Sequence, residues 1–324
     1  MTTRRSVLLL PLLAAATAWA QPRKTWRIGF LGAASADSPV WKRRVEGFRS
    51  GLRELGYTEG KNTVIEFRWA NGNAERLPAL AAELVAANVD VLVTATTQGA
   101  LAAKGATKTV PIVLASVGDP VSTGVVMSLA RPGVNITGSA MFAADETVKR
   151  LELLRDALPR TRRVVVLINP GNPLWKHAVE RIAQNAASQK LEVEFLEARS
   201  AAQLDGAFSA IAQKRPDAVV IVEDSLFTAE AGKLAALALQ HRLPSIGHLP
   251  FAEAGGLIGN GANQVELFRR AAVFVDKILR GAKPEDLPIE QASRFELVVN
   301  LKTAKALGIA LPKQFLFRVD RQIE

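Results

Sequence analysis

The chain has 324 residues, and its formal net charge of +10 comes from 41 Lys and Arg against 31 Asp and Glu. The basic residues are scattered; the longest run, Lys42–Arg44, favours a solvated helix face over a nucleic-acid patch. The chain contains no cysteine, so we expect neither disulfides nor a lipid anchor on a thiol. This length favours two domains, each with its own core.

Residues 1–20 have the pattern of a cleavable secretory signal peptide. A basic pair, Arg4–Arg5, precedes a nearly apolar run from Val7 that ends in Ala18-Trp19-Ala20. The run is shorter than the ~20 residues that a membrane span needs. We therefore predict cleavage after Ala20 and a periplasmic mature protein. The general secretory route and the twin-arginine route both stay open.

The first predicted strand of the mature chain, residues 27–32 (RIGFLG), runs into a loop of small residues. Gly29 and Gly32 lack the third glycine of a G-x-G-x-x-G fingerprint. No acidic residue ends a second strand about 20 residues further on, where such a site would bind a ribose. The sequence therefore excludes a dinucleotide site there, and we expect no cofactor.

Strand-like and helix-like segments then alternate almost to the end of the chain. Continuous apolar runs, typical of parallel strands that are buried on both faces, occur at residues 89–95, 110–115, 163–168 and 218–222. Amphipathic helices are predicted over residues 40–55, 73–87 and 264–280, with Asn73 as an N-cap and Gly56 and Gly281 just past helix ends. The pattern predicts an α/β fold with doubly wound parallel sheets.

A short motif occurs twice, each time at a predicted strand-to-helix turn. SPVWK (38–42) follows the first strand, and NPLWK (172–176) follows the strand at residues 163–168. The repeat favours two α/β lobes over one large sheet, with a boundary near residues 138–144. Ligands of open α/β sheets bind outside the carboxyl ends of the strands, so two facing lobes would form one shared cleft.

The loops at those strand ends supply the candidate ligand-binding residues. Thr96, Thr97 and Gln98 open a helix, where free N–H groups and hydroxyls favour a ligand carboxylate; simple N-capping is the alternative. Asp224 is the candidate partner of an ammonium group, or else a helix cap. Together the two assignments predict an α-amino acid or a close relative. The other polar candidates are Ser35, Ser116, Asn169 and His248, and a structural role is the alternative for the histidine.

The two tryptophans of the repeated motif, Trp41 and Trp175, are the aromatic candidates. If both rings point into the cleft, closure would sandwich a flat or apolar part of the solute between them. The alternative is that each ring packs its own helix against its own sheet. Glu223, the neighbour of Asp224, is expected to point away from the solute.

The residues predict no chemistry and no metal site. His177, His241 and His248 have no partner at the spacing of a motif such as H-E-x-x-H, and there is no G-x-S-x-G elbow. We therefore expect no catalytic residue; a secreted α/β hydrolase-type enzyme that acts on a small substrate is the alternative function. A sugar-responsive transcription regulator would need a DNA-binding headpiece where the signal peptide stands, so we expect no nucleic-acid partner.

Several segments carry a family resemblance, in order along nearly the whole mature chain. They are GLRELGYTEGKN (51–62), RLPALAAELV (76–85), VGDPVSTG (117–124), LARPGVNITG (129–138), KRLELLRDALP (149–159), FAEAGGLIGNG (251–261), VDKILRGAKPEDLP (275–288) and FELVVNLKTAKALG (295–308). The sequence thereby resembles the substrate-binding proteins of ABC transporters, above all the branch with tryptophan- and tyrosine-uptake proteins. One departure is Asn260, where relatives often carry an aromatic residue, so an aromatic solute stays undecided.

The resemblance implies the fold of type I periplasmic binding proteins, which have two lobes, a multi-segment hinge and a solute held in an interlobe cleft. The chain would cross between lobes near residues 139–144, 258–262 and 289–294. Lobe I would comprise residues 21–140 plus about 262–290, and lobe II residues 141–261 plus about 291–324. The implied function is capture of a small solute, an amino acid or related small carboxylate, by a monomer that delivers it to an ABC transporter permease.

Overall fold

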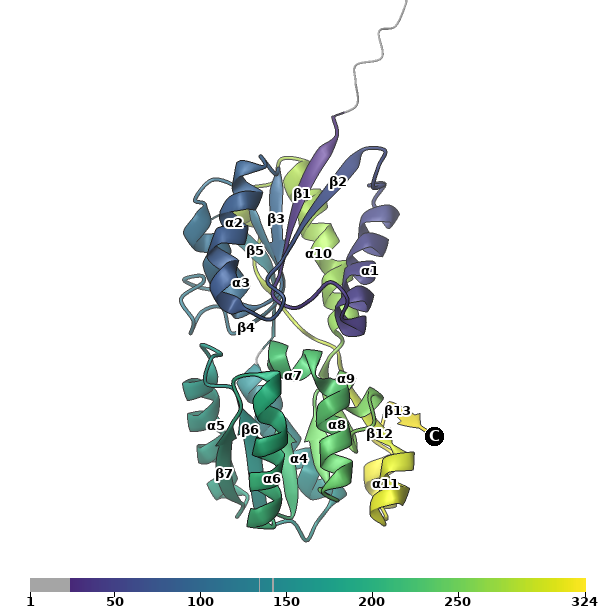
Figure 1. Ribbon diagram of the computed structural model, residues 1–324. Coiled ribbons are helices and arrows are strands. Elements are labelled where there is room, and N and C mark those ends of the chain that lie inside the picture. Colours follow the sequence, from purple (N-terminus) through teal and green to yellow (C-terminus); the bar gives the residue numbers. More distant parts are fainter. Residues whose placement is uncertain (1–23, 134, 142) are drawn as a thin grey trace, which may run out of the picture.

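The computed structural model describes residues 24–133, 135–141 and 143–324. The predicted signal peptide, residues 1–20, lies outside the described residues. The described chain forms two α/β lobes, one above the other in Figure 1, each built around its own sheet. None of the described helices is long and apolar enough to cross a membrane.

Lobe I contains a parallel sheet that is covered on both faces. Its strands are β1 (Trp26–Gly32), β2 (Thr63–Trp69), β3 (Val91–Thr94), β4 (Ile112–Gly118), β5 (Ile136–Met141) and β11 (Glu290–Gln291), in the spatial order β11-β5-β4-β3-β1-β2. Its helices are α1 (Pro39–Glu54), α2 (Leu77–Ala86), α3 (Thr97–Ala106) and α10 (Gln264–Leu279). Side chains of α1 and α10 bury one face of the sheet and those of α2 and α3 the other, as in a doubly wound fold.

Lobe II contains a mostly parallel sheet in the order β13-β12-β10-β9-β8-β6-β7. Its strands are β6 (Arg163–Ile168), β7 (Glu192–Glu197), β8 (Ala218–Ile221), β9 (Ser245–Gly247), β10 (Ile258–Ala262), β12 (Phe295–Asn300) and β13 (Arg321–Ile323). Its helices are α4 (Ala143–Ala157), α5 (Trp175–Ser188), α6 (Leu204–Lys214), α7 (Ser225–Ala229), α8 (Ala231–Gln240), α9 (Leu249–Glu253), α11 (Leu301–Leu307) and α12 (Lys313–Leu316).

One strand pair of lobe II departs from the parallel arrangement predicted for both sheets. β10 and β12 are antiparallel, while the other paired strands of this sheet run parallel. The reason is the path of the chain. β10 runs toward lobe I and leads into α10, whereas β12 comes back from β11 of lobe I and runs away from it. The chain thus passes between the sheets after β5, after β10 and after β11.

Local sequence features explain where α1, α2 and α10 begin or end. Gly56 and Gly281 follow α1 and α10 with φ values of 88° and 100°, a left-handed conformation that glycine adopts without strain. α2 begins later than predicted. Asn73 caps a short 3₁₀ turn (Ala74–Arg76), and the α-helix proper starts at Leu77, with Pro78 in the first turn where no N–H is needed.

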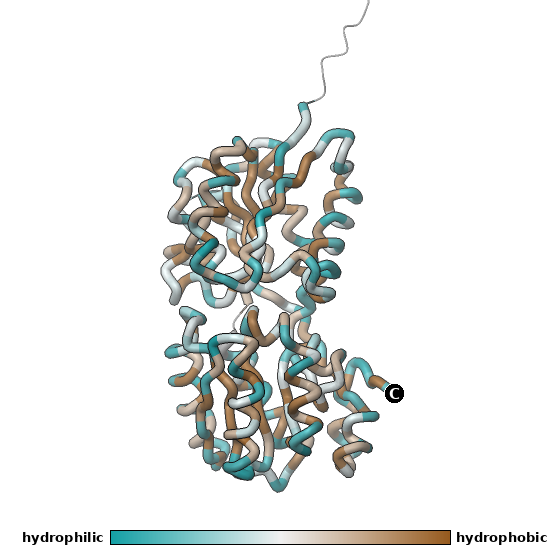
Figure 2. Tube along the Cα trace, viewed as in Figure 1, coloured by the Kyte–Doolittle hydropathy of each residue, from teal (hydrophilic) through white to brown (hydrophobic). Residues whose placement is uncertain are grey.

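The predicted apolar strands form the cores of both lobes. Every residue of β3 and β8 is buried, and the tube in Figure 2 is brown along the inner strands and mostly teal on the outer helix faces. Gly138 shows how tightly β4 and β5 approach. A Cβ at this glycine would lie 2.2 Å from the carbonyl oxygen of Leu114, so no other residue fits there. This contact requires glycine where β5 lies against β4 in the lobe I sheet.

Candidate functional site

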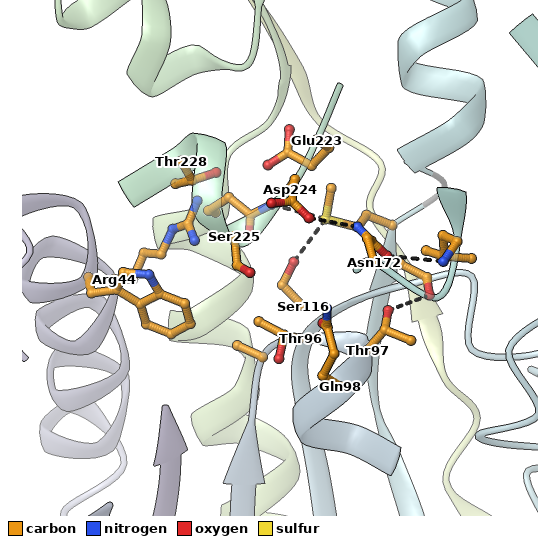
Figure 3. A pocket seen from close by; sticks show the side chains of 16 residues that line it. Arg44, Thr96, Thr97, Gln98, Ser116, Asn172, Glu223, Asp224, Ser225 and Thr228 are labelled. Carbon is orange, nitrogen blue, oxygen red and sulfur yellow. Dashed lines mark hydrogen bonds between the residues drawn. The ribbon is translucent and has the colours of Figure 1, made fainter. Parts of the chain in front are cut away.

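A polar pocket of about 60 Å³ lies where the carboxyl ends of the two sheets face each other (Figure 3). Lobe I supplies residues from α1, α10 and the ends of β3 and β4, and lobe II supplies the loops after β6 and β8. Among the predicted residues, those that line the pocket are Trp41, Thr96, Thr97, Gln98, Ser116 and Asp224.

The first turn of α3 forms one wall of the pocket. Oγ1 of Thr96 accepts a hydrogen bond of 3.1 Å from the N–H of Gly99, so capping, one of its two predicted roles, is present. Oγ1 of Thr97 donates to the carbonyl oxygen of Gly118 at 3.3 Å. A helix leaves its first N–H groups without intrahelical partners. The Thr96 hydroxyl hydrogen and the N–H groups of Thr97 and Gln98 are therefore the donors that this turn can offer to a solute.

Two further side chains connect this wall to its surroundings. Ser116 is 3% exposed, and its Oγ donates to Sδ of Met141 at 3.1 Å. Nε2 of Gln98 donates to the carbonyl oxygen of Gly171 at 3.4 Å and thus joins the two lobes beside the pocket. On the side of α1, Nη2 of Arg43 lies 2.7 Å from Oε2 of Glu253 in lobe II. These two contacts join the lobes around the pocket, and Nε2 of His177 in lobe II also lies 3.9 Å from Oδ2 of Asp119 in lobe I.

Arg44 also lines the pocket, a role that sequence reasoning missed. Lys42 and Arg43 are exposed as expected for a solvated face, but Arg44 is 6% exposed. Burial lowers the pKa of its guanidinium to about 10, so the group stays charged at neutral pH. Its Nε and Nη2 atoms have no hydrogen-bond partner among the described residues. The sequence did indicate this burial through helical spacing, because Arg44 follows Trp41 by one turn on the buried stripe of α1.

The structure does not bring the two motif tryptophans together. Trp41 is 1% exposed and packs in lobe I, with ring centroids 5.9 Å from those of Trp69 and Phe268, while one side of it lines the pocket. Trp175 lies outside this pocket and packs against the core of lobe II. The motif enters its helix differently in the two lobes. Trp41 is the third residue of α1 and Trp175 the first of α5, a difference of ~200° around a helix axis.

Asp224 forms the lobe II wall and is 4% exposed. Its Oδ1 accepts hydrogen bonds from the N–H of Leu226 at 2.8 Å, which caps α7, and from Nδ2 of Asn169 at 3.1 Å. Oδ2 accepts from Nδ2 of Asn172 at 3.0 Å. Burial raises the pKa of Asp224, and these hydrogen bonds oppose the shift. Asn169 therefore lies behind Asp224 and holds it, rather than lining the pocket itself.

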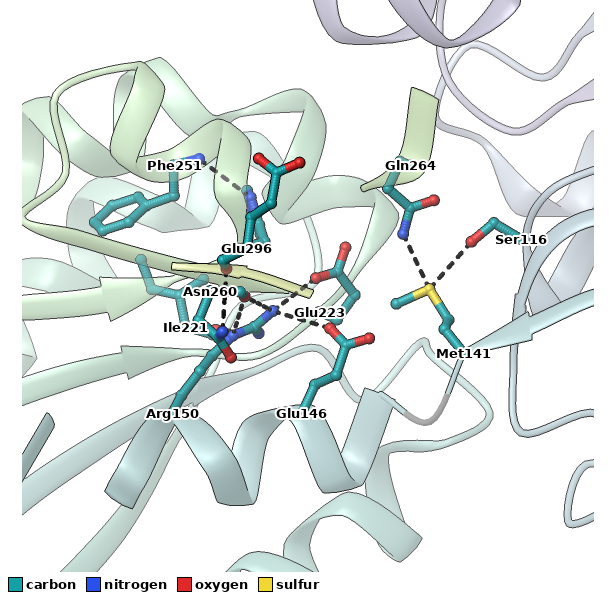
Figure 4. Close-up of polar contacts among 11 residues, drawn as sticks. Ser116, Met141, Glu146, Arg150, Ile221, Glu223, Phe251, Asn260, Gln264 and Glu296 are labelled. Atoms are coloured by element: carbon teal, nitrogen blue, oxygen red, sulfur yellow. Dashed lines mark hydrogen bonds and ion pairs between the residues drawn. The ribbon is translucent and has the colours of Figure 1, made fainter. Parts of the chain in front are cut away.

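Glu223, expected to point away from the solute, also lines the pocket. Figure 4 shows the reason, which is the buried Arg150 of α4. Nη2 of Arg150 lies 2.9 Å from Oε2 of Glu223 and 2.8 Å from the carbonyl oxygen of Asn260, while Nη1 donates to the carbonyl oxygen of Ile221 at 3.2 Å. Burial favours a higher pKa for Glu223, but neighbouring positive charges, among them Arg150 and Arg44, outweigh it and lower the pKa. Arg150 was a second residue missed from the sequence.

A second carboxyl group, Glu146 of α4, lies on the same arginine. Its Oε2 is 3.5 Å from Nη2 of Arg150, and its Oε1 has no partner among the described residues. Burial, together with the charge of Glu223, raises the pKa of Glu146 to about 8. At neutral pH this side chain is therefore mostly a neutral acid beside an ionised one.

The remaining candidates, His248 and Ser35, lie outside the pocket lining. His248 is 1% exposed, and its Nδ1 accepts from the N–H of Phe251 at 3.2 Å, which caps α9. Burial lowers its pKa to about 4, so the imidazole is neutral, in line with the structural alternative. Oγ of Ser35 accepts from the N–H of Asp37 in the loop after β1. No group of three or more His, Cys, Asp or Glu among the described residues is placed to hold a metal.

Residues 33–323 match the family described as ABC transporter substrate binding protein. The chain belongs to this family. It is 26% identical over 274 residues to a tyrosine-binding protein of Clostridioides difficile strain R20291, which covers 84% of this chain and 79% of that protein. The family implies a small-molecule ligand, a transporter permease as partner and a place outside the cytoplasm.

Solved structures agree with this assignment. A conserved domain protein of Vibrio cholerae is 29% identical, with a TM-score of 0.87 over 92% of this chain and 100% of that one. An ABC domain from Streptococcus pneumonia in complex with L-Trp is 25% identical, with a TM-score of 0.86 over 93% and 100%. A leucine-binding protein of Thermotoga maritima, 13% identical over 87% of each chain with a TM-score of 0.63, shares the fold.

The protein is therefore a substrate-binding protein of an ABC transporter, with the fold of type I periplasmic binding proteins. Its relatives are solute-binding proteins rather than enzymes, and the comparisons give no support to the hydrolase alternative.

Proposed function

We propose that this protein captures an amino acid, or a closely related small carboxylate, in the pocket between its lobes and delivers it to an ABC transporter permease. The supporting observation is the unequal chemistry of the two walls. Lobe I presents hydrogen-bond donors, including the first turn of α3, whereas lobe II presents the carboxylates of Glu223 and Asp224 (Figure 3). The charges of a zwitterion match these two walls in one orientation.

The carboxylate of the solute binds at the start of α3. The N–H groups of Thr97 and Gln98 and the positive end of the helix dipole favour an anion there. The hydroxyl of Thr96 borders the same space and adds a donor. Gln98 also contacts Gly171 of lobe II, so a solute at this turn lies beside a contact that joins the lobes.

The ammonium group of the solute binds Asp224. Its carboxylate is almost completely buried, and Asn169, Asn172 and the start of α7 fix its position. A positive group from the solute would offset the burial that raises the pKa of Asp224. That relatives are described as binding tyrosine and L-Trp supports an amino acid as the solute class.

The remaining elements of the proposal concern the mature protein. It is a periplasmic monomer after removal of residues 1–20. Lobe I comprises residues 21–140 plus about 262–290 and lobe II residues 141–261 plus about 291–324. The passages of the chain between the sheets, after β5, β10 and β11, support this division.

A thermal-shift screen of the mature protein tests the proposal. The probes are the L-amino acids, each compared with its decarboxylated amine and with the acid that lacks the amino group. A solute at 100 times its Kd stabilises the folded state by about 2.7 kcal/mol, and we expect this only when both groups are present. If no amino acid shifts the transition, the proposed solute class is wrong. Turnover of a compound that does shift it would instead indicate an enzyme.

A further inference from the structure

Three buried donors on one face of α1 have no acceptor in the protein. Nε and Nη2 of Arg44 and Nε1 of Trp41 have no hydrogen-bond partner among the described residues. Both residues line the pocket, at 6% and 1% exposure, and they are separated by one helical turn. The guanidinium of Arg44 also lies over the Trp41 ring, with its carbon 5.4 Å from the ring centroid. The ring thereby helps to hold the charged group in place.

The acidic groups around Arg44 have other hydrogen-bond partners within the protein. Oε2 of Glu223 is 2.9 Å from Nη2 of Arg150. The charge of Glu223 also acts on Arg44, whose pKa it raises. Asp224 accepts hydrogen bonds from Asn169, Asn172 and the start of α7. Arg44 itself forms no ion pair with any carboxylate in the described part of the chain, whereas its neighbour Arg43 pairs with Glu253.

The ionised side chains around the pocket sum to zero, but they form only one ion pair within the described chain, Arg150 with Glu223. Arg150 compensates Glu223, and Glu146 and His248 are mostly neutral near pH 7, which leaves Arg44 and Asp224. In the proposed function the solute ammonium compensates Asp224, and its α-carboxylate binds the first turn of α3. Arg44 would then stay buried, charged and without an acceptor, which is strongly unfavourable.

We propose that the solute carries a second acidic group, and that Arg44 and the indole N–H of Trp41 bind it. The transported class is then an amino dicarboxylic acid. The geometry of the guanidinium fits this role, because Nε and Nη2 lie on one edge and together present two N–H groups to a planar carboxylate. This inference rests on the proposed function, since it takes the α-carboxylate and the ammonium group as bound elsewhere.

Isothermal titration calorimetry of the mature protein tests it with matched probes. L-aspartate and L-glutamate are compared with L-asparagine and L-glutamine, which have almost the same shape but no second charge. We expect the better-fitting acid to bind about tenfold to a hundredfold more tightly than its amide, the range for hydrogen bonds to a charged group. Equal or tighter binding of the amide overturns the inference.

Two variants assign the preference to one residue. Arg44→Gln is expected to bind acid and amide with similar affinity, because the acid loses its partner. Arg53→Gln is the matched control: it removes the same charge from α1 at an exposed position that pairs with Glu46, so the preference is expected to persist. A preference for the acid that survives in Arg44→Gln also overturns the inference.

The outcomes separate this inference from the proposed function. If the wild type binds neutral amino acids as well as acidic ones, only the second acidic group is wrong. If it binds no amino acid at all, the proposed function fails and the inference fails with it.

Discussion

Each lobe buries one arginine, Arg44 in the lining of the interlobe pocket and Arg150 behind it, and the two differ in what surrounds them. Arg150 of lobe II, fully buried, contacts the carboxyl groups of Glu223 and Glu146 and the carbonyl oxygens of Ile221 and Asn260. Arg44 of lobe I is nearly as buried, but two of its nitrogens have no partner in the described chain. The charge of Arg150 is therefore used within the protein, whereas that of Arg44 is free for a solute.

The same contrast extends to the rest of the two walls. The lobe II carboxylates are fixed beforehand, Glu223 by Arg150 and Asp224 by two asparagines. Arg150 also connects this wall to the strands that pass between the lobes. It binds the carbonyl oxygen of Asn260 in β10, and Nδ2 of Asn260 donates to the carbonyl oxygen of Glu296 in β12. Lobe II thus presents a preorganised half-site, and lobe I presents the donors that the solute must satisfy.

The largest expected effect comes from removing the lobe II arginine. Arg150→Met leaves Glu223 and Glu146 buried beside each other without their counter-charge. Removing one partner of a buried ion pair destabilises a protein by about 3–5 kcal/mol. Arg44→Met removes a buried charge that has no partner, so the ligand-free protein is expected to keep its stability or to gain some. Urea unfolding of both variants at pH 7 measures the difference. If both variants lose the same free energy of unfolding, the two arginines do not differ in how the protein compensates their charges.

Asp224→Asn tests whether the lobe II carboxylate binds the ammonium group of the solute. Asparagine is as good a helix cap as aspartate, so α7 keeps its start and the fold is expected to persist. The solute ammonium loses its ionised partner, which weakens binding by about 1.5–3 kcal/mol, the range for a hydrogen bond to a charged group. Calorimetry with the solute found by screening measures this loss. The control is Asp217→Asn, because Asp217 accepts from the backbone of Arg162 and Arg163, outside the pocket. Unchanged affinity in Asp224→Asn would contradict the ammonium site.

Glu146 should make the lobe II cluster sensitive to pH. Its pKa is raised from 4.5 to about 8, so its contribution to stability is complete at low pH and is lost as the pH rises through 8. His248 acts oppositely, because its pKa is lowered from 6.5 to about 4 and its contribution is lost as the pH falls toward 4. Between pH 6.5 and 8 the Glu146 effect is the larger of the two, because the unfolded-state imidazole is already at least half neutral there.

We therefore expect the free energy of unfolding to fall by about 1–2 kcal/mol between pH 6.5 and 8. Glu146→Gln, which resembles the neutral acid, should be nearly independent of pH in this window. Urea titrations of both proteins at several pH values measure the two slopes. The same slope in the variant would show that another group titrates.

Local sequence rules predicted the two α/β lobes and six of the residues that line the pocket, but not the antiparallel pair β10–β12. Continuous apolar runs mark β3, β4, β6 and β8 because strands buried on both faces need no alternation. Parallel topology then places the residues that follow those strands at one edge, which is why Thr96, Ser116 and Asp224 were predictable.

The sequence did not predict that Arg44 and Glu223 line the pocket, because their positions depend on contacts with distant segments of the chain. Lys42–Arg44 has the composition of a solvated face. Arg44 differs from its neighbours by its place one turn after Trp41, and it lines the pocket that both lobes form. Glu223 faces the pocket because Arg150, distant in sequence, binds it there. The repeated tryptophan motif was misleading for a local reason. Its helix starts two residues later in lobe II, so the ring of Trp175 emerges on another side of the helix.

The smallest expected effect compares the two motif tryptophans directly. Trp41 lines the pocket with an unpartnered indole N–H, whereas Trp175 packs against the lobe II core outside it. Trp41→Phe retains a ring to pack against Trp69 and Phe268 but loses the N–H and part of the aromatic surface. We expect it to weaken solute binding by roughly 0.5–1.5 kcal/mol and to abolish most of the change in intrinsic fluorescence on binding. Trp175→Phe, the matched control, should leave both the affinity and the fluorescence change intact. If both variants show the same affinity and the same fluorescence change, Trp41 does not contact the solute more closely than Trp175 does.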